Sequence, residues 1–284
     1  MGIIERAADK LAQTGRPVLS QPVDTSLHRD PQPTTTNAPT PNRTGKSVEI
    51  DLEKLRTMGM VTPDMGRSSI SEEFRAIKRS LITTTFETSA DSSKPNNLIM
   101  VTSSLAGEGK TFCATNLAMS IAAELDHTVL LVDADVARPA VLHAFGLKPQ
   151  AGLMDLLLDS SIDVADVMLK TNVDTLTILP AGRSHPHATE LLASHAMSKL
   201  LLELASRYHD RVVIFDSPPL LLTSEASALA EQMGQIVLVV EGETTTQSAL
   251  KNSLRKIKSC GNIALIYNKA RLFQSEEQYG YYYN

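Results

Sequence analysis

Residues 98–111, LIMVTSSLAGEGKT, carry side chains that could bind a phosphate group. An apolar run leads into a loop of small residues that ends in Gly109, Lys110 and Thr111, and a helix-like segment follows. Loops of this kind hold phosphates with backbone N–H groups and a helix N-terminus. The lysine contacts the β- and γ-phosphates, and the threonine hydroxyl binds Mg²⁺. The usual pattern has glycine six residues before the lysine, where this chain has Ser104. The stretch therefore predicts a P-loop, with an ordinary strand–helix turn as the alternative.

Two further segments place carboxylates after apolar runs. Residues 128–138, TVLLVDADVAR, contain Asp133 and Asp135, and residues 211–219, RVVIFDSPP, contain Asp216. Ligands of open parallel α/β sheets bind outside the carboxyl ends of the strands. A single aspartate at such a place is often only an N-cap. Three of them beside a phosphate loop predict a site for Mg²⁺ and a nucleotide.

The elements that must position these residues alternate between apolar strands and amphipathic helices. This alternation predicts an α/β protein of the P-loop NTPase class, with a doubly wound, mostly parallel sheet and helices on both faces. Strands are predicted at 98–102, 128–132, 175–179, 211–215, 235–240 and 262–266. Helices are predicted at 71–81, 110–125, 139–145, 152–158, 188–207, 224–231 and 246–259, with Ser71 as an N-cap.

Composition narrows the functional classes. The chain has 284 residues and a net charge of −5, which gives no electrostatic case for nucleic acid as a partner. Cys113 and Cys260 have no metal or redox spacing and suit a reducing compartment. The sequence contains no apolar run near the roughly 18–20 residues of a membrane span. A cytoplasmic protein is therefore expected.

The ends of the chain differ from its middle. Residues 1–15 have the spacing of a short amphipathic helix, residues 16–47 read as a disordered linker, and residues 48–272 form the predicted P-loop domain. Residues 273–284 are predicted to be a flexible tail. This tail holds four of the six tyrosines of the chain: Tyr279, Tyr281, Tyr282 and Tyr283. Such a cluster could be a docking element, or it could be the substrate.

Together these motifs resemble the bacterial tyrosine kinases, or BY-kinases, of capsule and exopolysaccharide export. The resemblance covers roughly residues 66–284 and rests on SSLAGEGKT, VDADVARP, IFDSPP and the terminal tyrosines, with support from LPAG, ELLAS and AGLMDLL. More narrowly, the chain is similar to the stand-alone cytoplasmic members of this family, including those of exosortase-linked polysaccharide loci. The resemblance implies an ATP-dependent autokinase that phosphorylates C-terminal tyrosines of a neighbouring subunit and regulates polysaccharide chain length or export.

The resemblance also implies roles for individual residues. Catalysis would depend on Lys110, Asp133 and Asp135, with Asp133 the candidate for activating the tyrosine hydroxyl. Mg²⁺ would be held by Thr111, Asp133, Asp135 and Asp216. ATP would be contacted by Ser104, Ala106, Gly107, Glu108, Gly109, Lys110, Thr111, Phe112, Arg138 and Asn268, the last at the base.

Partners are implied in the same way. The family's oligomerisation helix carries Glu-x-x-Arg-x-x-Arg, matched here by Glu72, Arg75 and Lys78, so a lysine replaces the second arginine. Lysine lacks the planar bidentate fork of arginine, which changes the expected geometry of a homo-oligomer or ring. The resemblance further implies protein tyrosine substrates and a transmembrane adaptor of the chain-length-determinant type. Such an adaptor would recruit the protein to the inner membrane.

Three other classes compete with this interpretation. A positioning ATPase of the partition or septum-site class would carry a lysine early in the loop, where this chain has Leu105. An iron–sulfur carrier ATPase would need paired cysteines such as CxxC. A scaffold with a degenerate P-loop would not need Lys110 and the three aspartates.

Overall fold

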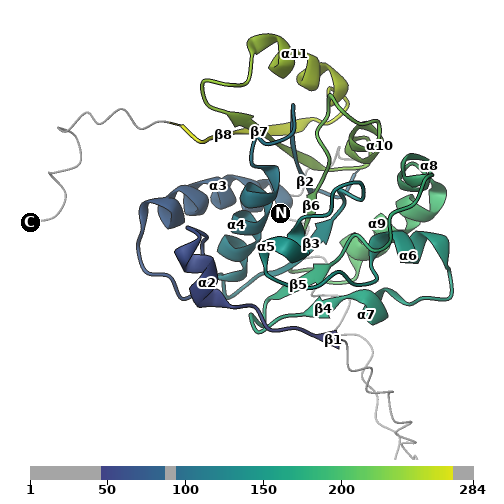
Figure 1. Cartoon of the computed structure of the whole chain (residues 1–284), viewed down its shortest axis with the longest axis horizontal. Coiled ribbons are helices and arrows are strands. Elements are labelled where there is room, and N and C mark those ends of the chain that lie inside the picture. Colours follow the sequence, from purple (N-terminus) through teal and green to yellow (C-terminus); the bar gives the residue numbers. More distant parts are fainter. Residues whose placement is uncertain (1–45, 87–93, 271–284) are drawn as a thin grey trace, which may run out of the picture. The chain divides into compact units, whose positions relative to one another are not determined.

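The computed structural model describes residues 46–86 and 94–270, which belong to a single unit of the chain (Figure 1). Its centre is an eight-stranded sheet with the order β1-β4-β5-β3-β6-β2-β7-β8. The strands are β1 (Lys46–Ser47), β2 (Leu98–Ser103), β3 (Thr128–Asp133), β4 (Leu169–Lys170), β5 (Leu176–Leu179), β6 (Arg211–Asp216), β7 (Gln235–Glu241) and β8 (Asn262–Asn268).

Strand pairing is parallel except between β4 and β5. The carboxyl ends of β2, β3 and β6 therefore meet at one edge of the sheet. The register pairs Asp133 with Asp216 across β3 and β6. Two of the predicted carboxylates thus begin from directly adjacent backbone positions.

Helices cover both faces of the sheet (Figure 1). On one face lie α2 (Leu52–Thr57), α3 (Ser69–Phe86), α4 (Lys110–Ala122) and α5 (Val141–Ala144). On the other lie α6 (Leu153–Leu158), α7 (Val164–Val167), α8 (Ala188–Leu192), α9 (His195–Ser206), α10 (Glu225–Ala230) and α11 (Gln247–Lys256).

Strand β2 shows why two layers form. Leu98 and Met100 belong to the core cluster under α9 and α10, whereas Ile99 and Val101 belong to the cluster under α3 and α4. Successive strand residues point to opposite faces of a sheet, so an entirely apolar strand needs cover on both sides. The predicted doubly wound α/β architecture is confirmed.

The six predicted strands are confirmed within two residues, but some helices differ. The predicted helix at 188–207 is two helices, because the Ser194 side chain accepts a hydrogen bond from the Met197 amide and starts α9 there. Ser71 is not an N-cap, since α3 begins at Ser69. Ser68 instead exchanges hydrogen bonds with Ser71: each backbone amide donates to the other hydroxyl.

Short elements were not predicted. Helix α2 has six residues, α7 has four and strand β4 has two, which is too few for a clear periodic pattern. Strand β1 lies within the last two residues of the predicted linker and pairs with β4. The predicted N-terminal helix, the rest of the linker and the tyrosine-rich tail lie outside the described residues.

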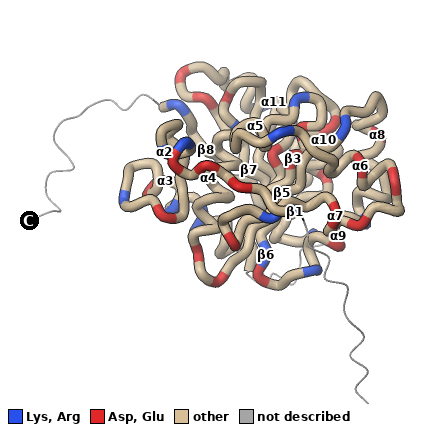
Figure 2. The backbone as a smooth tube through the Cα atoms, turned by 60° about the horizontal axis from the view of Figure 1, so that its bottom comes forward, with Lys and Arg blue, Asp and Glu red and all other residues tan. Residues whose placement is uncertain are grey.

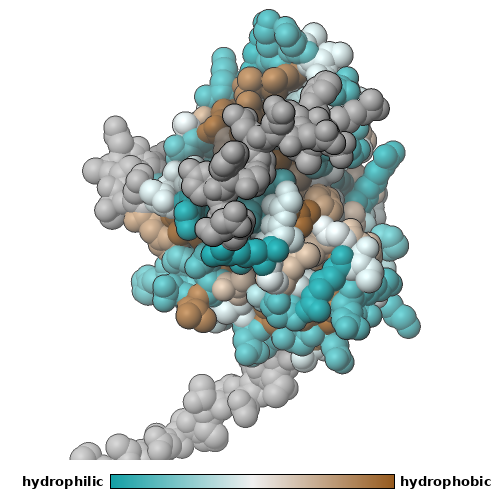
Figure 3. Space-filling model, turned by 90° about the vertical axis from the view of Figure 1, so that its left-hand side faces the viewer, coloured by the Kyte–Doolittle hydropathy of each residue, from teal (hydrophilic) through white to brown (hydrophobic). Residues whose placement is uncertain are grey.

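Positively and negatively charged residues are interspersed over the described chain (Figure 2). The face that presents α2 and α3 mixes hydrophilic residues with smaller hydrophobic areas (Figure 3). Within residues 46–86 and 94–270, no helix is long and apolar enough to cross a bilayer.

Candidate nucleotide and phosphoryl-transfer site

The loop between β2 and α4 has the backbone of a phosphate-binding loop. Gly107 and Gly109 adopt φ values of 89° and 97°, in the left-handed region that favours glycine. A Cβ atom at Gly109 would also overlap the Nδ2 atom of Asn268. Gly109 is the N-cap of α4 and, as a glycine, has no side chain that could accept a hydrogen bond from the first amides of the helix. The first amides of α4 therefore remain available to an anion.

Lys110 joins the loop to the carboxylates. Its Nζ donates to Oδ2 of Asp135 at 2.7 Å and lies 3.9 Å from Oδ1 of Asp216. Burial alone would lower the pKa of Lys110, but the charges of Asp216 and Asp135 outweigh burial and raise it. The ammonium group is thus held charged at the sheet edge, as neutralising a phosphate requires.

Asp216 is the most enclosed of the three aspartates. Its side chain is fully buried, and neither carboxylate oxygen has a hydrogen bond of full geometry within the described chain. Burial raises the pKa of Asp216 to about 6, while Lys110 and the Thr111 hydroxyl lower it. A buried carboxylate with free lone pairs needs a compensating positive charge, so this position fits a metal ion.

Asp133 holds the start of α5. Its Oδ2 accepts hydrogen bonds from the amides of Ala140 and Val141 at 3.0 and 2.9 Å. Its Oδ1 is buried and has no partner among the described residues. Burial, with added repulsion from Asp216, raises the pKa of Asp133 to about 7 despite these two hydrogen bonds.

A Mg²⁺ ion at the carboxyl ends of these strands would be held by only a few protein ligands. No group of three or more His, Cys, Asp or Glu side chains in the described chain could hold a metal alone. Mg²⁺ usually keeps several waters and binds one or two carboxylates together with substrate phosphates. Thr111 and Asp216 suit that pattern. Asp135 is engaged by Lys110 and by the amide of Arg138 at 3.1 Å.

A cavity of about 450 Å³ lies beside the loop. The residues that line it include five predicted site residues: Ala106, Gly107, Lys110, Asp135 and Arg138. Its volume is in the range of small-molecule sites, about 300–1,000 Å³. Leu222, 58 % exposed, also lines this cavity.

Three predicted ATP-contacting residues use their side chains elsewhere. The hydroxyl of Ser104 pairs with that of Ser253 in α11 at 2.8 Å. The carboxylate of Glu108 accepts from the Leu105 amide at 2.8 Å and from the Thr245 hydroxyl. Both side chains shape the loop, so only their backbone groups remain for a phosphate. The ring of Phe112 likewise packs edge-on against a ring of α3, Phe74.

The end of β8 is attached to the same loop. Asn268 Nδ2 donates to the carbonyl oxygen of Glu108 at 2.9 Å, and Lys269 Nζ donates to that of Gly107 at 2.8 Å. Lys269 also lies 3.2 Å from Glu241. Sequence reasoning missed Lys269, Thr245 and Ser253, because each lies more than 130 positions from the loop that it contacts and no local pattern marks it.

The predicted oligomerisation motif divides into two parts. Glu72 is exposed and Arg75 is half-buried, and the two side chains pair with each other at 2.6 Å. Lys78 is buried: its Nζ donates to the Ser120 carbonyl at 2.7 Å and pairs with Glu124 at 2.6 Å. Its contacts are therefore made within the chain, at the C-terminus of α4, and its role in oligomerisation stays a prediction.

The remaining candidate residues are the four tyrosines near the C-terminus and the two cysteines. Tyr279, Tyr281, Tyr282 and Tyr283 lie outside the described residues. Cys113 and Cys260 are both buried free thiols. Burial raises the pKa of Cys113 to about 12, so its thiol is unreactive.

This fold and loop define a P-loop nucleotide-binding protein, and residues 96–267 match the AAA domain family. The chain is 32 % identical over 218 residues to the tyrosine-protein kinase YwqD of Bacillus subtilis, covering 76 % of this chain and 87 % of that one. It is 27 % identical over 221 residues to the putative tyrosine-protein kinase CapB of Staphylococcus aureus, covering 77 % and 92 %. The chain belongs to the bacterial tyrosine-protein kinase family and is a kinase of that class.

Solved structures of kinase domains are also similar to this chain. The VpsO kinase domain superposes with a TM-score of 0.56 at 30 % identity, over 72 % of this chain and all of that one. The kinase domain of Escherichia coli ETK superposes with a TM-score of 0.61 at 24 % identity, over 81 % and 99 %, which supports the fold. These relatives favour the tyrosine-kinase interpretation over the positioning ATPase.

Proposed function

We propose that this chain is an ATP- and Mg²⁺-dependent autokinase that phosphorylates the C-terminal tyrosines of a neighbouring copy. The observation that carries the proposal is the position of Lys110, on the P-loop, 2.7 Å from Asp135 and beside buried Asp216. Phosphoryl transfer mainly requires positioning and charge stabilisation. The membership of the chain in a tyrosine-kinase family supports the choice of acceptor.

Each residue has a role in this reaction. The amides of the loop and of α4 bind the phosphates, and Lys110 neutralises charge on the γ-phosphate. Bound Mg²⁺ supplies further charge neutralisation, with Thr111 and Asp216 as its protein ligands. The phenol oxygen forms a bond to the γ-phosphorus while the bond to the leaving oxygen of ADP breaks. The phenol proton passes to Asp133, whose Oδ1 is free to accept it.

The tail is suited to transfer between copies. About ten residues separate the end of β8 from Tyr279, and they span at most roughly 35 Å when extended. A tether of this length in an oligomer raises the local concentration of the tail towards the millimolar range. Each phosphate adds about −1.5 to −2 charges, so a fully modified tail would carry roughly −6 to −8. Such a tail would be repelled from a site lined by aspartates, and the oligomer would loosen.

The biological setting follows from the same interpretation. The kinase would regulate the chain length or export of an exopolysaccharide. It would act at the inner membrane through a transmembrane adaptor whose cytoplasmic segment completes the site. Weak phosphorylation by the isolated chain, raised by an adaptor peptide, would support this arrangement. Full activity of the chain alone would count against it.

Intact-mass analysis after incubation with Mg²⁺ and ATP tests the autokinase. The full chain should gain up to four phosphates, whereas Lys110→Met and a chain ending at Gln278 should gain none. Mixing Lys110→Met, which keeps its tail, with the chain that ends at Gln278 should place phosphate on the former. ATP hydrolysis without added phosphate, even with an adaptor peptide, would contradict the proposal and favour an ATPase switch.

A further inference from the structure

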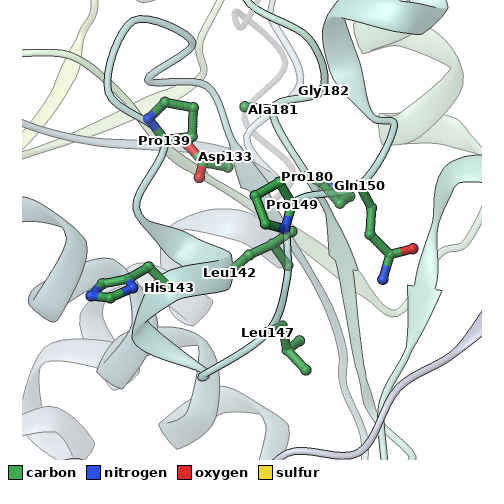
Figure 4. Close-up of a pocket in the computed structure, with 10 residues that line it drawn as sticks. All are labelled: Asp133, Pro139, Leu142, His143, Leu147, Pro149, Gln150, Pro180, Ala181 and Gly182. Atoms are coloured by element: carbon green, nitrogen blue, oxygen red, sulfur yellow. The ribbon is translucent and has the colours of Figure 1, made fainter.

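Two further cavities are lined by residues outside the phosphate loop. One, of about 260 Å³, has Asp133 in its wall and adjoins the site described above (Figure 4). The other, of about 190 Å³, is lined by residues in or next to α7, β4, β5, the end of α9 and the start of β6. This cationic cavity has three positively charged side chains in its lining, those of Lys170, Arg207 and Arg211. No carboxylate of the described residues lines it.

Three polar residues of the cationic cavity occupy positions on the α9 side of the sheet. Val212 belongs to the core cluster under α3 and α4. Because successive strand residues point to opposite faces, its neighbour Arg211 faces the α9 side. Lys170 and Thr177 are register partners on β4 and β5 and face the same side by the same alternation. Other positions of this layer, such as Val213, are apolar, so packing of the core does not explain two cations here.

Arg211 has an unsatisfied donor. Its guanidinium carbon lies 3.8 Å from the centroid of the Tyr208 ring, while its Nε atom is buried and has no hydrogen-bond partner within the described chain. Burial lowers the pKa of Arg211 and outweighs the opposing charges of Tyr208 and Asp210, and neighbouring Arg207 lowers it further. A buried cation costs free energy unless an anion compensates its charge. Arg211 therefore indicates an anionic ligand.

The chain neutralises the three cations only in part. Arg207 pairs with Glu203 at 3.2 Å, and both side chains of this pair are partly exposed. Lys170 and Arg211 form no ion pair with a carboxylate of residues 46–86 or 94–270. Two positive charges of the cationic cavity are therefore available to a ligand.

A phosphate monoester fits this combination of charge, size and lining. It carries about −1.5 to −2 charges and three acceptor oxygens, and the planar guanidinium of arginine can donate two parallel hydrogen bonds to it. The cavity is smaller than the sites of drug-sized ligands, which occupy about 300–1,000 Å³. Ala165 and Met168 supply an apolar wall for the group that carries the phosphate. The hydroxyl of Thr177 adds a further donor.

We propose that the cationic cavity binds a phosphate monoester, with its phosphoryl group on Arg211 and Lys170 and its esterified group against Met168. Two sources carry this chemistry: a phosphorylated tyrosine side chain and a free sugar phosphate. The site is separate from the phosphate loop, because Arg211 begins β6 and Asp216 ends it, about 17 Å further along the strand. A ligand in the cationic cavity therefore leaves the nucleotide site open, and the inference does not depend on the proposed function.

An NMR titration with phenyl phosphate tests the site. The ¹⁵N-labelled, dephosphorylated full chain is first saturated with Mg²⁺ and ADP, so that the phosphate loop is blocked. Phenyl phosphate should shift the Nε–H signal of Arg211, which is assigned by its loss in Arg211→Lys. An unshifted signal would overturn the proposal.

Two exposed lysines provide the matched variants. Lys170→Met removes a charge of the cationic cavity and should raise the Kd for phenyl phosphate about tenfold, since a hydrogen bond to a charged group is lost. Lys199→Met removes a charge of α9 outside the lining and should stay within twofold of the unmodified chain. Equal Kd values for the two variants would overturn the proposal.

Two more probes distinguish the sources of the phosphate. One is a peptide of residues 271–284 phosphorylated at Tyr281, and the other is glucose 1-phosphate. Both should shift the Arg211 signal, and the one with the lower Kd identifies the source. The peptide without phosphate should not shift it, and a shift as large as that of the phosphopeptide would overturn the proposal. A chain that binds phenyl phosphate here but phosphorylates no tyrosine would keep this site and lose the proposed function.

Discussion

The Nζ atom of Lys269 lies 2.8 Å from the carbonyl oxygen of Gly107 and 3.2 Å from Oε1 of Glu241. The residue that follows β8 is therefore bonded to the centre of the phosphate loop. Asn268, its neighbour, bonds to the Glu108 carbonyl in the same loop. The segment at the end of β8, which leads into the tyrosine-rich tail, is thus hydrogen-bonded directly to the phosphate loop.

Replacing Lys269 should weaken nucleotide binding. Lys269→Met keeps the length of the side chain but removes the hydrogen bond that fixes Gly107. A partly exposed hydrogen bond of this kind contributes about 0.5–1.5 kcal/mol, which corresponds to a rise in the Kd for ADP of about 2- to 10-fold. Calorimetric titration with ADP measures this Kd. Lys258→Met, at an exposed position after α11, should bind ADP like the unmodified chain; an unchanged Kd in Lys269→Met would show that the contact does not support the loop.

The departure of the loop from the glycine pattern has a structural reason. Ser104 stands where glycine is usual, and its hydroxyl pairs with that of Ser253 in α11, both fully buried. Ser104→Ala and Ser253→Ala should each lower the free energy of unfolding by about 1 kcal/mol. The double variant should lose little more than one single variant, because either change breaks the same bond. Urea unfolding measures all four chains, and strictly additive losses would mean that the two hydroxyls are not coupled.

The sequence could predict the site only where local pattern and chemistry coincide. Lys110, Asp135 and Asp216 each follow an apolar strand, and the rule that parallel strands present their carboxyl ends together was enough to join them. The resemblance places Glu108 among the residues that contact ATP, but its carboxylate accepts a hydrogen bond from Thr245, which is distant in sequence, and only the fold reveals this contact. The motif assigns Lys78 to an oligomer interface, but α3 lies against α4 and the amine of Lys78 donates to the Ser120 carbonyl. Tertiary contacts between distant segments decided both outcomes.

The two halves of the predicted oligomerisation motif should respond differently to mutation. Lys78→Met removes a buried hydrogen bond and an ion pair, and should lower the free energy of unfolding by about 1–3 kcal/mol. Arg75→Met affects only an exposed pair and should change stability by less than about 0.5 kcal/mol, while lowering the oligomeric mass if the exposed part of α3 forms an interface.

Urea unfolding and sedimentation of the two variants separate these effects. The stability of the metal-free monomer is compared first, and then the mass of the chain with Mg²⁺ and ADP. A Lys78→Met chain of unchanged stability would contradict the intramolecular role of Lys78. A normal oligomer in Arg75→Met would remove this helix face from the interface.

The paired aspartates at the sheet edge should make the metal-free protein less stable as pH rises. The pKa values of Asp133 and Asp216 are raised to about 7 and about 6 in the folded chain, chiefly by burial. Between pH of about 4 and 7 the folded chain therefore binds more protons than the unfolded chain. The free energy of unfolding should fall through this window, in which both groups must ionise in a buried place.

Asp133→Asn removes one of these groups and retains an oxygen for the two amides of α5. Between pH 5 and 7.5 the variant should lose less stability than the unmodified chain, by about 2–4 kcal/mol, since one pKa unit corresponds to about 1.4 kcal/mol. Urea unfolding in EDTA at the two pH values measures the difference, and Asp174→Asn, at an exposed position before β5, controls for loss of a charge. Parallel pH dependences of the variant and the unmodified chain would mean that Asp133 ionises as easily in the folded protein as in the unfolded one, and burial at this edge would then not hold its proton.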